Sequence, residues 1–257
     1  MDKRPVGVFD SGLGGASVLR EALKILPTEN YIYYGDNKNA PYGDRSEQEI
    51  LELSLKSADF LMSFGIKIML LACNTATGTA IREIRERLSI PVISIEPAIK
   101  PACEEVIEGK ILMLATKATT KMERYHKLKA KMPKCCEIVD VPCPGLVERI
   151  EQGVLGIGEF DDILNSHLRN FEGENIGGVV LGCTHYVFIK EVIADYAKRH
   201  FVGSCKLFDG NAGTVHQLAR VLNNKGLQND CKKPSVEFHT SGEETILKPL
   251  FDKLLNS

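Results

Sequence analysis

Short apolar runs alternate with longer amphipathic stretches along the whole chain. Each apolar run has the length of a β-strand, and the stretches between them carry helical periodicity. The segment 46–64, for example, opens with the capping box SEQE of a helix N-terminus. This alternation predicts an α/β fold with parallel sheets flanked by helices, and runs such as IKIMLLA fit sheets buried on both faces. The predicted strands are 6–9, 31–35, 66–72, 91–96, 110–115, 137–141, 177–182 and 206–209.

Two domains are expected rather than one. The segment 90–102 carries three prolines and indicates a change of chain direction. Two short stretches, LLACNTATGTA (70–80) and VVLGCTHYVFI (179–189), share one pattern. In both, an apolar strand is followed by a small residue, a cysteine, polar residues that include threonine, and a predicted helix. The repetition suggests two related halves.

Composition places the chain among ordinary globular proteins. Of its 257 residues, 44% are hydrophobic and 26% are charged, with a formal net charge of −2. This charge gives no reason to expect nucleic acid or an anionic membrane as a partner. No apolar stretch has the length of a signal peptide or a membrane span, so we expect a cytoplasmic protein.

Eight cysteines are present, without any CxxC pair. Zinc sites usually show closely spaced ligands, and only Cys135, Cys136 and Cys143 approach such spacing. The histidines show no metal-ligand spacing either. We therefore expect no metal site, no disulfide framework in a reducing cytosol, and free thiols, some of them packed as small hydrophobic residues.

Cys73 and Cys183 occupy the two matching joints. In open parallel sheets, ligands bind at the carboxyl ends of strands, where the next helices begin. A helix N-terminus favours the thiolate and lowers the pKa of a thiol from its usual value of about 8.5. One such cysteine is readily explained as a small buried residue, whereas two in matching settings favour chemistry.

Three kinds of chemistry use thiols in this way. A redox pair usually lies close in sequence, and acyl transfer needs one cysteine with a histidine base, which leaves the other thiol unexplained. Removal of a proton from one face of a carbon and its return to the opposite face needs two bases. Stereoinversion without a cofactor therefore fits best.

The glycine-rich segment 8–23 predicts a strand, a tight turn and a helix, whose N–H groups could hold an anion. It departs from G-x-G-x-x-G because residue 17 is serine. Asp10 lacks the second acid expected of a phosphoryl-accepting aspartate, so it is better suited to orient an ammonium group or tune a thiol. Tyr42 and Gly43 lie in a polar loop that is either a simple connection or a source of contacts to a carboxylate. His185 lies close enough to Cys183 in sequence to adjust its proton affinity.

Four ordered motifs, FDSGLGG, APYG, ACNTAT and GCTHY, resemble those of the glutamate racemases in the cofactor-independent aspartate/glutamate racemase superfamily. The resemblance covers roughly residues 5–210. It implies two pseudo-symmetric α/β domains with the active site in the cleft between them. The first would comprise 1–97 and 208–257, and the second 98–207.

The resemblance also implies roles for particular residues. Cys73 and Cys183 would be the two acid/base residues, assisted by Asp10, His185 and Glu151. Glu148 is an alternative to Glu151, because the stretch around both is less apolar than is usual in the family. The implied substrate-binding residues are Asp10, Ser11, Tyr42, Gly43, Asn74, Thr75, Thr116, Thr119, Thr184 and His185.

The implied activity is cofactor-independent interconversion of L-glutamate and D-glutamate, with D-glutamate feeding peptidoglycan synthesis, and family members often form homodimers. Three alternatives remain open at this point. An aspartate racemase is the nearest, a catalytically silent amino-acid-binding module belongs to another class, and a thiol hydrolase would use only one of the two cysteines.

Overall fold

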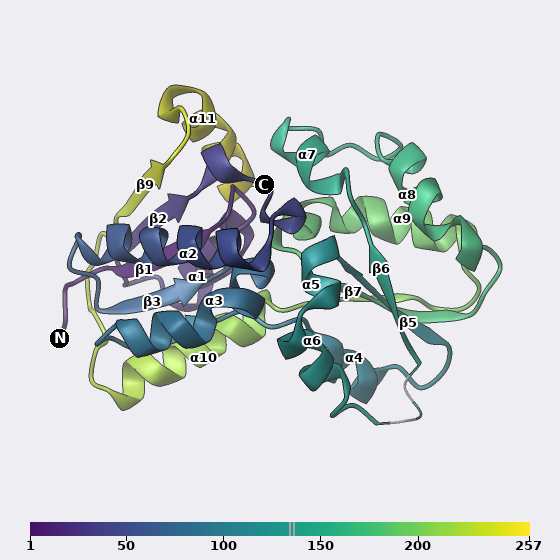
Figure 1. Ribbon diagram of the computed structural model, residues 1–257, viewed down its shortest axis with the longest axis horizontal. Helices are drawn as coiled ribbons and strands as arrows, with labels where there is room; N and C mark the ends of the chain where they lie inside the picture. The colour runs from purple at the N-terminus through teal and green to yellow at the C-terminus, as the bar shows by residue number, and fades with distance from the viewer. Residues whose placement is uncertain (134, 136) are drawn as a thin grey trace. The chain divides into compact units, whose positions relative to one another are not determined.

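The computed structural model of the protein describes residues 1–133, 135 and 137–257. The chain forms two compact units, which we call unit 1 (Met1–Glu96 with Asn211–Ser257) and unit 2 (Pro97–Gly210). Each unit has a parallel sheet flanked by helices, so the predicted α/β class is confirmed (Figure 1).

In unit 1 the sheet has the strand order β4-β3-β1-β2-β9, and every neighbouring pair is parallel. All residues of β1 and β3 are buried, which explains their continuous apolar sequences. The strands are β1 (Val6–Asp10), β2 (Tyr31–Gly35), β3 (Ile68–Leu71), β4 (Val92–Ser94) and β9 (Val236–Thr240).

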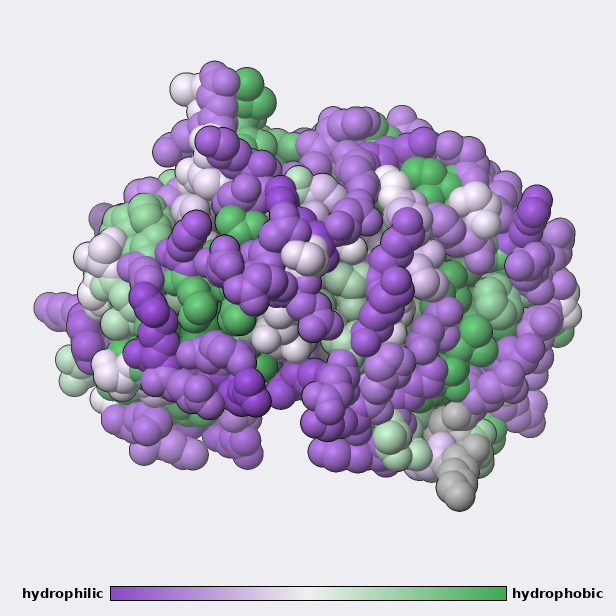
Figure 2. Space-filling view, viewed as in Figure 1, coloured by the Kyte–Doolittle hydropathy of each residue, from purple (hydrophilic) through white to green (hydrophobic). Residues whose placement is uncertain are grey.

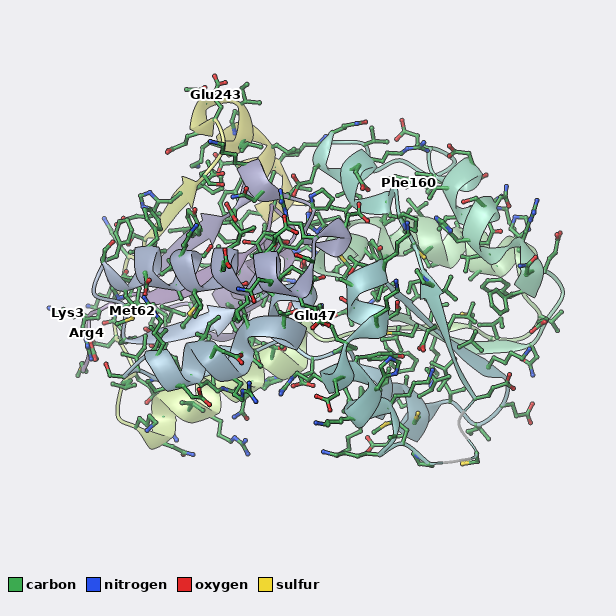
Figure 3. All side chains as sticks on the ribbon, viewed as in Figure 1. Lys3, Arg4, Glu47, Met62, Phe160 and Glu243 are labelled. Atoms are coloured by element: carbon green, nitrogen blue, oxygen red, sulfur yellow. The ribbon has the colours of Figure 1, made fainter. Side chains whose placement is uncertain are left out.

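Helices cover the sheet of unit 1, with α2 packed against α3, and α1 packed against α10 and α11. Ser46 caps α2 through the complete capping box that the sequence predicts. Figure 3 labels Glu47 and Met62, the first and last residues of this helix. The helices are α1 (Ala16–Ile25), α2 (Glu47–Met62), α3 (Asn74–Arg87), α10 (Asn211–Asn224) and α11 (Glu244–Leu255), with 3₁₀ helices η1 (Asn37–Asn39) and η2 (Tyr42–Asp44).

In unit 2 the strand order is β6-β5-β7-β8, again with parallel pairs throughout. The strands are β5 (Lys110–Ala115), β6 (Ile138–Pro142), β7 (Ile176–Leu181) and β8 (Lys206–Asp209). The helices are α4 (Ile99–Glu105), α5 (Lys117–Lys121), α6 (Glu123–Lys129), α7 (Leu146–Glu151), α8 (Asp161–Leu168) and α9 (Lys190–His200), with 3₁₀ helices η3 (Arg169–Phe171) and η4 (Thr184–Ile189).

One core cluster of unit 2 joins its strands to α7, α8, η4 and α9. Phe160, labelled in Figure 3, is fully buried at the start of α8. The Arg149 guanidinium carbon lies over its ring, 5.7 Å from the ring centre. Burial of large side chains of this kind supplies most of the stabilisation of such a layer.

The two units share one strand order. Numbered within each unit, the first four strands follow the order 4-3-1-2 in both sheets, and β9 extends the sheet of unit 1 beyond β2. Cys73 and Cys183 each follow the third strand, β3 or β7. The similarity of the two cysteine joints in sequence therefore corresponds to equivalent positions in two sheets of equal topology.

The predicted strands are confirmed, and each end lies within two residues of the predicted one. The run 66–72 forms a shorter strand, Ile68–Leu71, although the Lys67 amide still donates to the carbonyl of Pro5 at 3.0 Å. Strand β9 was missed, because only Phe238 of its residues is buried. Phe238 packs between Tyr33 and Phe251, with ring centres 5.9 and 4.4 Å away, and this packing fixes the strand at the sheet edge.

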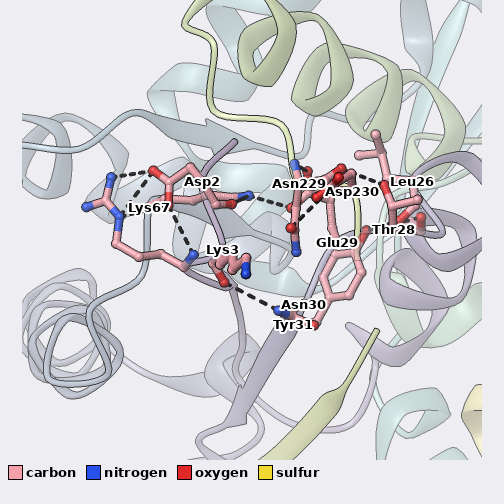
Figure 4. A network of polar contacts seen from close by, with 12 residues as sticks. Asp2, Lys3, Leu26, Thr28, Glu29, Asn30, Tyr31, Lys67, Asn229 and Asp230 are labelled. Carbon is pink, nitrogen blue, oxygen red and sulfur yellow. Dashed lines mark hydrogen bonds and ion pairs between the residues drawn. The ribbon is translucent and has the colours of Figure 1, made fainter. Parts of the chain in front are cut away.

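A buried ion pair ties together the amino ends of the strands of unit 1 (Figure 4). Lys67 Nζ lies 2.5 Å from Glu29 Oε2, and the two side chains are 0% and 1% exposed. Lys67 Nζ also donates to the carbonyl of Asp2 at 2.8 Å. The amide of Asn229 donates to Glu29 Oε1 at 2.9 Å. These contacts join the segments that lead into β1, β2, β3 and β9.

Polar side chains cover most of the face seen in Figure 2, with apolar atoms in patches between them. Among the described helices, none is both long and apolar enough to cross a membrane.

We expect Lys67→Met to lower the free energy of unfolding by about 3–5 kcal/mol, because it leaves the Glu29 carboxylate buried without its cation. The double variant Lys67→Met/Glu29→Leu should lose less than the sum of the single changes. Chemical denaturation measures both. Asp59→Asn, which removes the exposed 2.6 Å pair with Arg87, is the control and should cost no more than about 1 kcal/mol. Equal losses for the buried and the exposed pair would contradict the assignment.

Candidate functional site

The thiol of unit 1 lies at the junction of β3 and α3. Cys73 is the N-cap residue of α3, and its sulfur accepts a hydrogen bond from the amide of Ala76 at 3.4 Å. The residue is 5% exposed. The first N–H groups of a helix have no partner within it, so a cap that accepts from them is favourable. Here the acceptor is sulfur, and the amide stabilises negative charge on it.

A second polar partner of the Cys73 sulfur follows the neighbouring strand. Ser11 follows β1, which pairs with β3, and its Oγ lies 3.3 Å from the Cys73 sulfur. The pairing continues past the strand end, where Ala72 N donates to the carbonyl of Phe9 at 2.8 Å. Parallel pairing thus places Ser11 and Cys73 side by side, as the carboxyl-end argument predicts.

Asp10 ends β1 and is fully buried, with its Oδ1 accepting from the amide of Gly12 at 2.8 Å. A Cβ atom at Gly15 would lie 2.7 Å from the Asp10 Cβ, so glycine is required there. The glycine-rich turn therefore folds around the Asp10 carboxylate. This explains the glycines without the dinucleotide-binding function that their spacing already disfavoured.

Tyr42 and Gly43 lie in η2, in the loop that follows β2. The Tyr42 side chain is buried, and its hydroxyl donates to Asp36 Oδ2 at 2.6 Å. Burial and the negative charge of Asp36 raise the pKa of Tyr42 above its usual value. The hydroxyl is thus held as a neutral donor.

Asn74 and Thr75, the first residues of α3, are also buried. Asn74 Oδ1 is buried and accepts no hydrogen bond within the part of the chain that the structure describes. An unpaired buried acceptor is costly, so its retention calls for a partner outside the chain.

The thiol of unit 2 follows β7 through Gly182. A Cβ atom at Gly182 would lie 2.2 Å from the Met113 Cε and 2.9 Å from the Leu114 carbonyl oxygen, which excludes any larger residue. Cys183 is 8% exposed. The expected helix directly after it is wrong in type, because η4 is a 3₁₀ helix and α9 begins only at Lys190.

The two thiols consequently differ in their surroundings. No backbone amide among the described residues caps the Cys183 side chain. Its sulfur instead lies 3.7 Å from His185 Nδ1, and His185 Nε2 lies 2.8 Å from Glu151 Oε1. A charged imidazole donates from both nitrogens, so it bridges the sulfur and the carboxylate.

His185 is buried, which by itself opposes its charged form. Hydrogen bonds to Cys183 and Glu151, together with their negative charges, outweigh this burial and raise the pKa of His185 well above its usual value. Glu151 ends α7 with its side chain 18% exposed, whereas Glu148 on the same helix is exposed to solvent. The geometry of the described residues therefore favours Glu151 over Glu148 as the partner of His185.

The threonines of unit 2 lie at the carboxyl ends of neighbouring strands. Thr116 follows β5 and caps α5, accepting from the amide of Thr119 at 3.2 Å, while its hydroxyl donates to Thr119 Oγ1 at 3.0 Å. Thr184 is buried directly after Cys183. Strands β5 and β7 are paired, so these hydroxyl groups and the thiol share one edge of the sheet.

Two further residues lie near the site, of which the sequence indicated Cys143 only as a possible metal ligand and Asp36 not at all. Cys143 follows β6, is buried, and donates to the Val141 carbonyl at 3.3 Å. Burial and the nearby Cys183 sulfur raise the pKa of the Cys143 thiol. Asp36, the acceptor for Tyr42, was missed, since its only signal was its place at the end of a predicted strand.

Cys135, Cys136 and Cys143 are the cysteines whose spacing comes nearest to that of metal ligands. Cys136 lies outside the described residues. Cys135 is exposed, whereas Cys143 is buried. Across the described ranges, no group of three or more histidine, cysteine, aspartate or glutamate residues could hold a metal ion.

The chain is similar to known proteins in both sequence and fold. The model of the Asp/Glu/hydantoin racemase family matches residues 12–218. A glutamate racemase of Clostridium perfringens is 44% identical over 254 residues, which cover 98% of this chain and 96% of that protein.

Solved structures of similar fold give the same result. The glutamate racemase of Francisella tularensis, crystallised in complex with D-glutamate, has a TM-score of 0.86 at 30% identity, covering 100% of this chain and 95% of that one. A glutamate racemase isoform of Bacillus anthracis has a TM-score of 0.85 at 28% identity, covering 100% and 96%. By sequence and by fold, the chain belongs to the Asp/Glu/hydantoin racemase family.

Proposed function

We propose that this protein is a glutamate racemase, an isomerase that interconverts L-glutamate and D-glutamate by proton transfer at the α-carbon. One observation carries the proposal: in each unit, a buried cysteine with polar partners follows the third strand of the sheet. Family membership and the activity named for its relatives support the same substrate.

Cys73 and Cys183 are the two bases of the proposed reaction. In one direction the thiolate of one cysteine removes the α-proton, and the thiol of the other donates a proton to the opposite face of the carbanion. After this step the first cysteine is a thiol and the second a thiolate. The reverse reaction starts from this state, with the roles of the two cysteines exchanged. The proposal requires one substrate molecule to be within reach of both sulfurs, and it uses side chains alone, without a cofactor.

An α-proton of an amino acid is a very weak acid, so the carbanion-like transition state has to be stabilised by donors arranged in advance. In the proposal, Ser11, Thr75 and Thr184 contribute hydroxyl groups, and Tyr42 and Gly43 contribute backbone N–H groups to the substrate carboxylate. Asn74 and Asp10 bind the substrate from unit 1, and Thr116, Thr119 and His185 do so from unit 2. The unpaired Asn74 Oδ1 is suited to accept from the substrate ammonium group.

In the proposal, His185 and Glu151 adjust the proton affinity of Cys183, the second base. An imidazolium beside Cys183 stabilises the thiolate, and Glu151 holds the ring in place through the 2.8 Å contact to Nε2. Asp10 assists on the side of Cys73 in the proposal, because it is buried one residue before the serine that contacts the sulfur.

The wider setting belongs to the same proposal. The product D-glutamate would supply peptidoglycan synthesis in the cytoplasm, and the active species would be a homodimer. The nearest alternative substrate is aspartate, and the alternatives from other classes are an amino-acid-binding module and a thiol hydrolase.

The proposed chemistry predicts that L-glutamate in D₂O loses optical activity, and that deuterium enters the α-position, without added cofactor. Cys73→Ser and Cys183→Ser should each lower kcat/KM by at least about 10²-fold, because serine is a much weaker acid than cysteine. Polarimetry and proton NMR on the same samples measure the two processes together.

Cys135→Ser is the matched control, since it replaces an exposed thiol, and it should retain full activity. Exchange with L-aspartate but not L-glutamate would correct the substrate. Full activity in either variant at Cys73 or Cys183 would exclude the two-base reaction, and binding of glutamate without any exchange would favour a binding module.

Glu151→Gln should shift the alkaline limb of the pH–rate profile to lower pH. Glu151 is one cause of the raised pKa of His185, so its removal lowers the pH at which the imidazolium loses its proton. The pH dependence of kcat/KM, followed together with the histidine resonances by NMR, measures the shift.

The same argument applies to stability. A raised pKa in the folded state gives stability that is fully present below the unfolded-state pKa and is lost as pH rises through the folded-state pKa, so in Glu151→Gln this loss should be smaller and complete at a lower pH. Glu148→Gln should leave both properties unchanged. A shift caused by Glu148→Gln instead would reverse the assignment of the assisting carboxylate.

A further inference from the structure

Asp36 is a buried carboxylate at the carboxyl end of β2, one residue beyond the strand. It is 3% exposed, and it is not among the residues that the sequence assigns to the site. Oδ2 accepts from the Tyr42 hydroxyl at 2.6 Å and Oδ1 from the Ser241 hydroxyl at 2.6 Å. The Asn39 side-chain amide donates to both oxygens, at 3.0 and 3.1 Å.

These four hydrogen bonds occupy the acceptor positions of the Asp36 carboxylate. An ionised carboxyl group accepts about four hydrogen bonds and donates none. Hydrogen bonds to a charged acceptor are about twice as strong as those between neutral groups, and burial removes competition from water. The cluster of Asp36, Asn39, Tyr42 and Ser241 is therefore a strong and directional set of contacts within unit 1.

The same cluster joins two distant segments of the chain. Asn39 and Tyr42 belong to the loop 37–45, whereas Ser241 follows β9 at the edge of the sheet. Ser241 N donates to the Gly35 carbonyl at 3.1 Å, and Lys38 N donates to Ser241 Oγ at 3.1 Å. The loop is thus fixed to the segment after β9 as well as to Asp36.

Further contacts hold the remainder of the loop. Thr240 Oγ1 donates to Asn37 Oδ1 at 2.9 Å, and Arg45 Nε donates to the Asn39 carbonyl at 2.5 Å. Because the Tyr42 hydroxyl donates its hydrogen to Asp36, the remaining donor of Tyr42 for a ligand is its backbone N–H group.

We propose that Asp36 is a positioning residue, which fixes Tyr42 and Asn39 so that the loop 37–45 keeps the conformation that binds the substrate carboxylate. Ser241 connects the segment after β9 to this function. The inference rests on the proposed function, in which Tyr42 and Gly43 bind the substrate. It assigns Asp36 no contact with the substrate.

Kinetics of Asp36→Asn test the proposal. The amide keeps the shape of the side chain but turns one acceptor into a donor, which opposes the donors of Asn39 and Tyr42. We expect KM for L-glutamate to rise about tenfold or more, because a charged acceptor is lost. The value of kcat should change by less than about threefold, because the loop binds substrate and transition state alike. Ser241→Ala should raise KM by a smaller factor of about two to four.

A merely structural role gives a different result. Partial unfolding lowers the active fraction, and with it the apparent kcat, while KM stays constant. Asp44→Asn is the matched control, since Asp44 is an exposed carboxylate in the same loop, and its KM should equal that of the unmodified protein. If Asp36→Asn does not fold, Ser241→Ala and Asn39→Ser carry the same comparison.

A second measurement does not depend on activity. The protein labelled with 3-fluorotyrosine has seven tyrosines, and the ¹⁹F resonance that disappears in Tyr42→Phe belongs to Tyr42. This resonance should shift in Asp36→Asn and stay in place in Asp44→Asn.

The outcomes separate the two proposals. If the unmodified protein binds glutamate without turning it over, the racemase proposal fails, and the dissociation constants of glutamate for the variants replace KM. An unchanged KM or dissociation constant in Asp36→Asn, or a fall in kcat alone, overturns the positioning role. A protein that binds no glutamate overturns both.

Discussion

Parallel pairing is the constraint on which the chemistry of this protein depends. It brings the carboxyl ends of neighbouring strands to one edge of each sheet, so side chains distant in sequence become neighbours. Ser11 and Cys73 are 62 positions apart, yet 3.3 Å separate Oγ from Sγ, because β1 and β3 run side by side. The same constraint acts in unit 2, where Thr116 and Thr184 follow the paired strands β5 and β7. Both thiols follow the third strand of a shared order.

The contacts at the amino ends of the strands in unit 1 stabilise the fold. The buried pair of Lys67 and Glu29 joins the segments that precede the strands, together with Asp2 and Asn229. Ion pairs of this kind are sensitive to the loss of one partner, whereas catalytic groups have to remain available to a ligand. Unit 1 thus has a buried ion pair at the amino ends of its strands and its candidate chemistry at their carboxyl ends.

Much of the fold could be predicted from sequence, because fully buried parallel strands leave continuous apolar runs and capped helices leave local signals. Strand β9 left no such signal, since one buried residue, Phe238, holds it through aromatic packing. Within the site, Cys73 and Cys183 were found because their local motifs repeat. Asp36 could not be found, because its burial and its contacts, one of them from the Ser241 hydroxyl 205 positions away, arise only in the folded chain. The 3₁₀ helix after Cys183 was missed for a similar reason, because helix type there depends on packing rather than on composition.

The unlike surroundings of the two thiols have a consequence for the energetics of the proposed reaction. Cys73 contacts an amide and a hydroxyl group, whereas Cys183 contacts an imidazole, which in turn contacts a carboxylate. Mirror-image amino acids have equal free energies in water, so this inequality cannot displace the overall equilibrium from unity. The ratio kcat/KM must therefore be equal for the two enantiomers at every pH. A difference in basicity between the two sulfurs can therefore change kcat and KM only by the same factor. The enantiomer with the lower KM then also has the lower kcat.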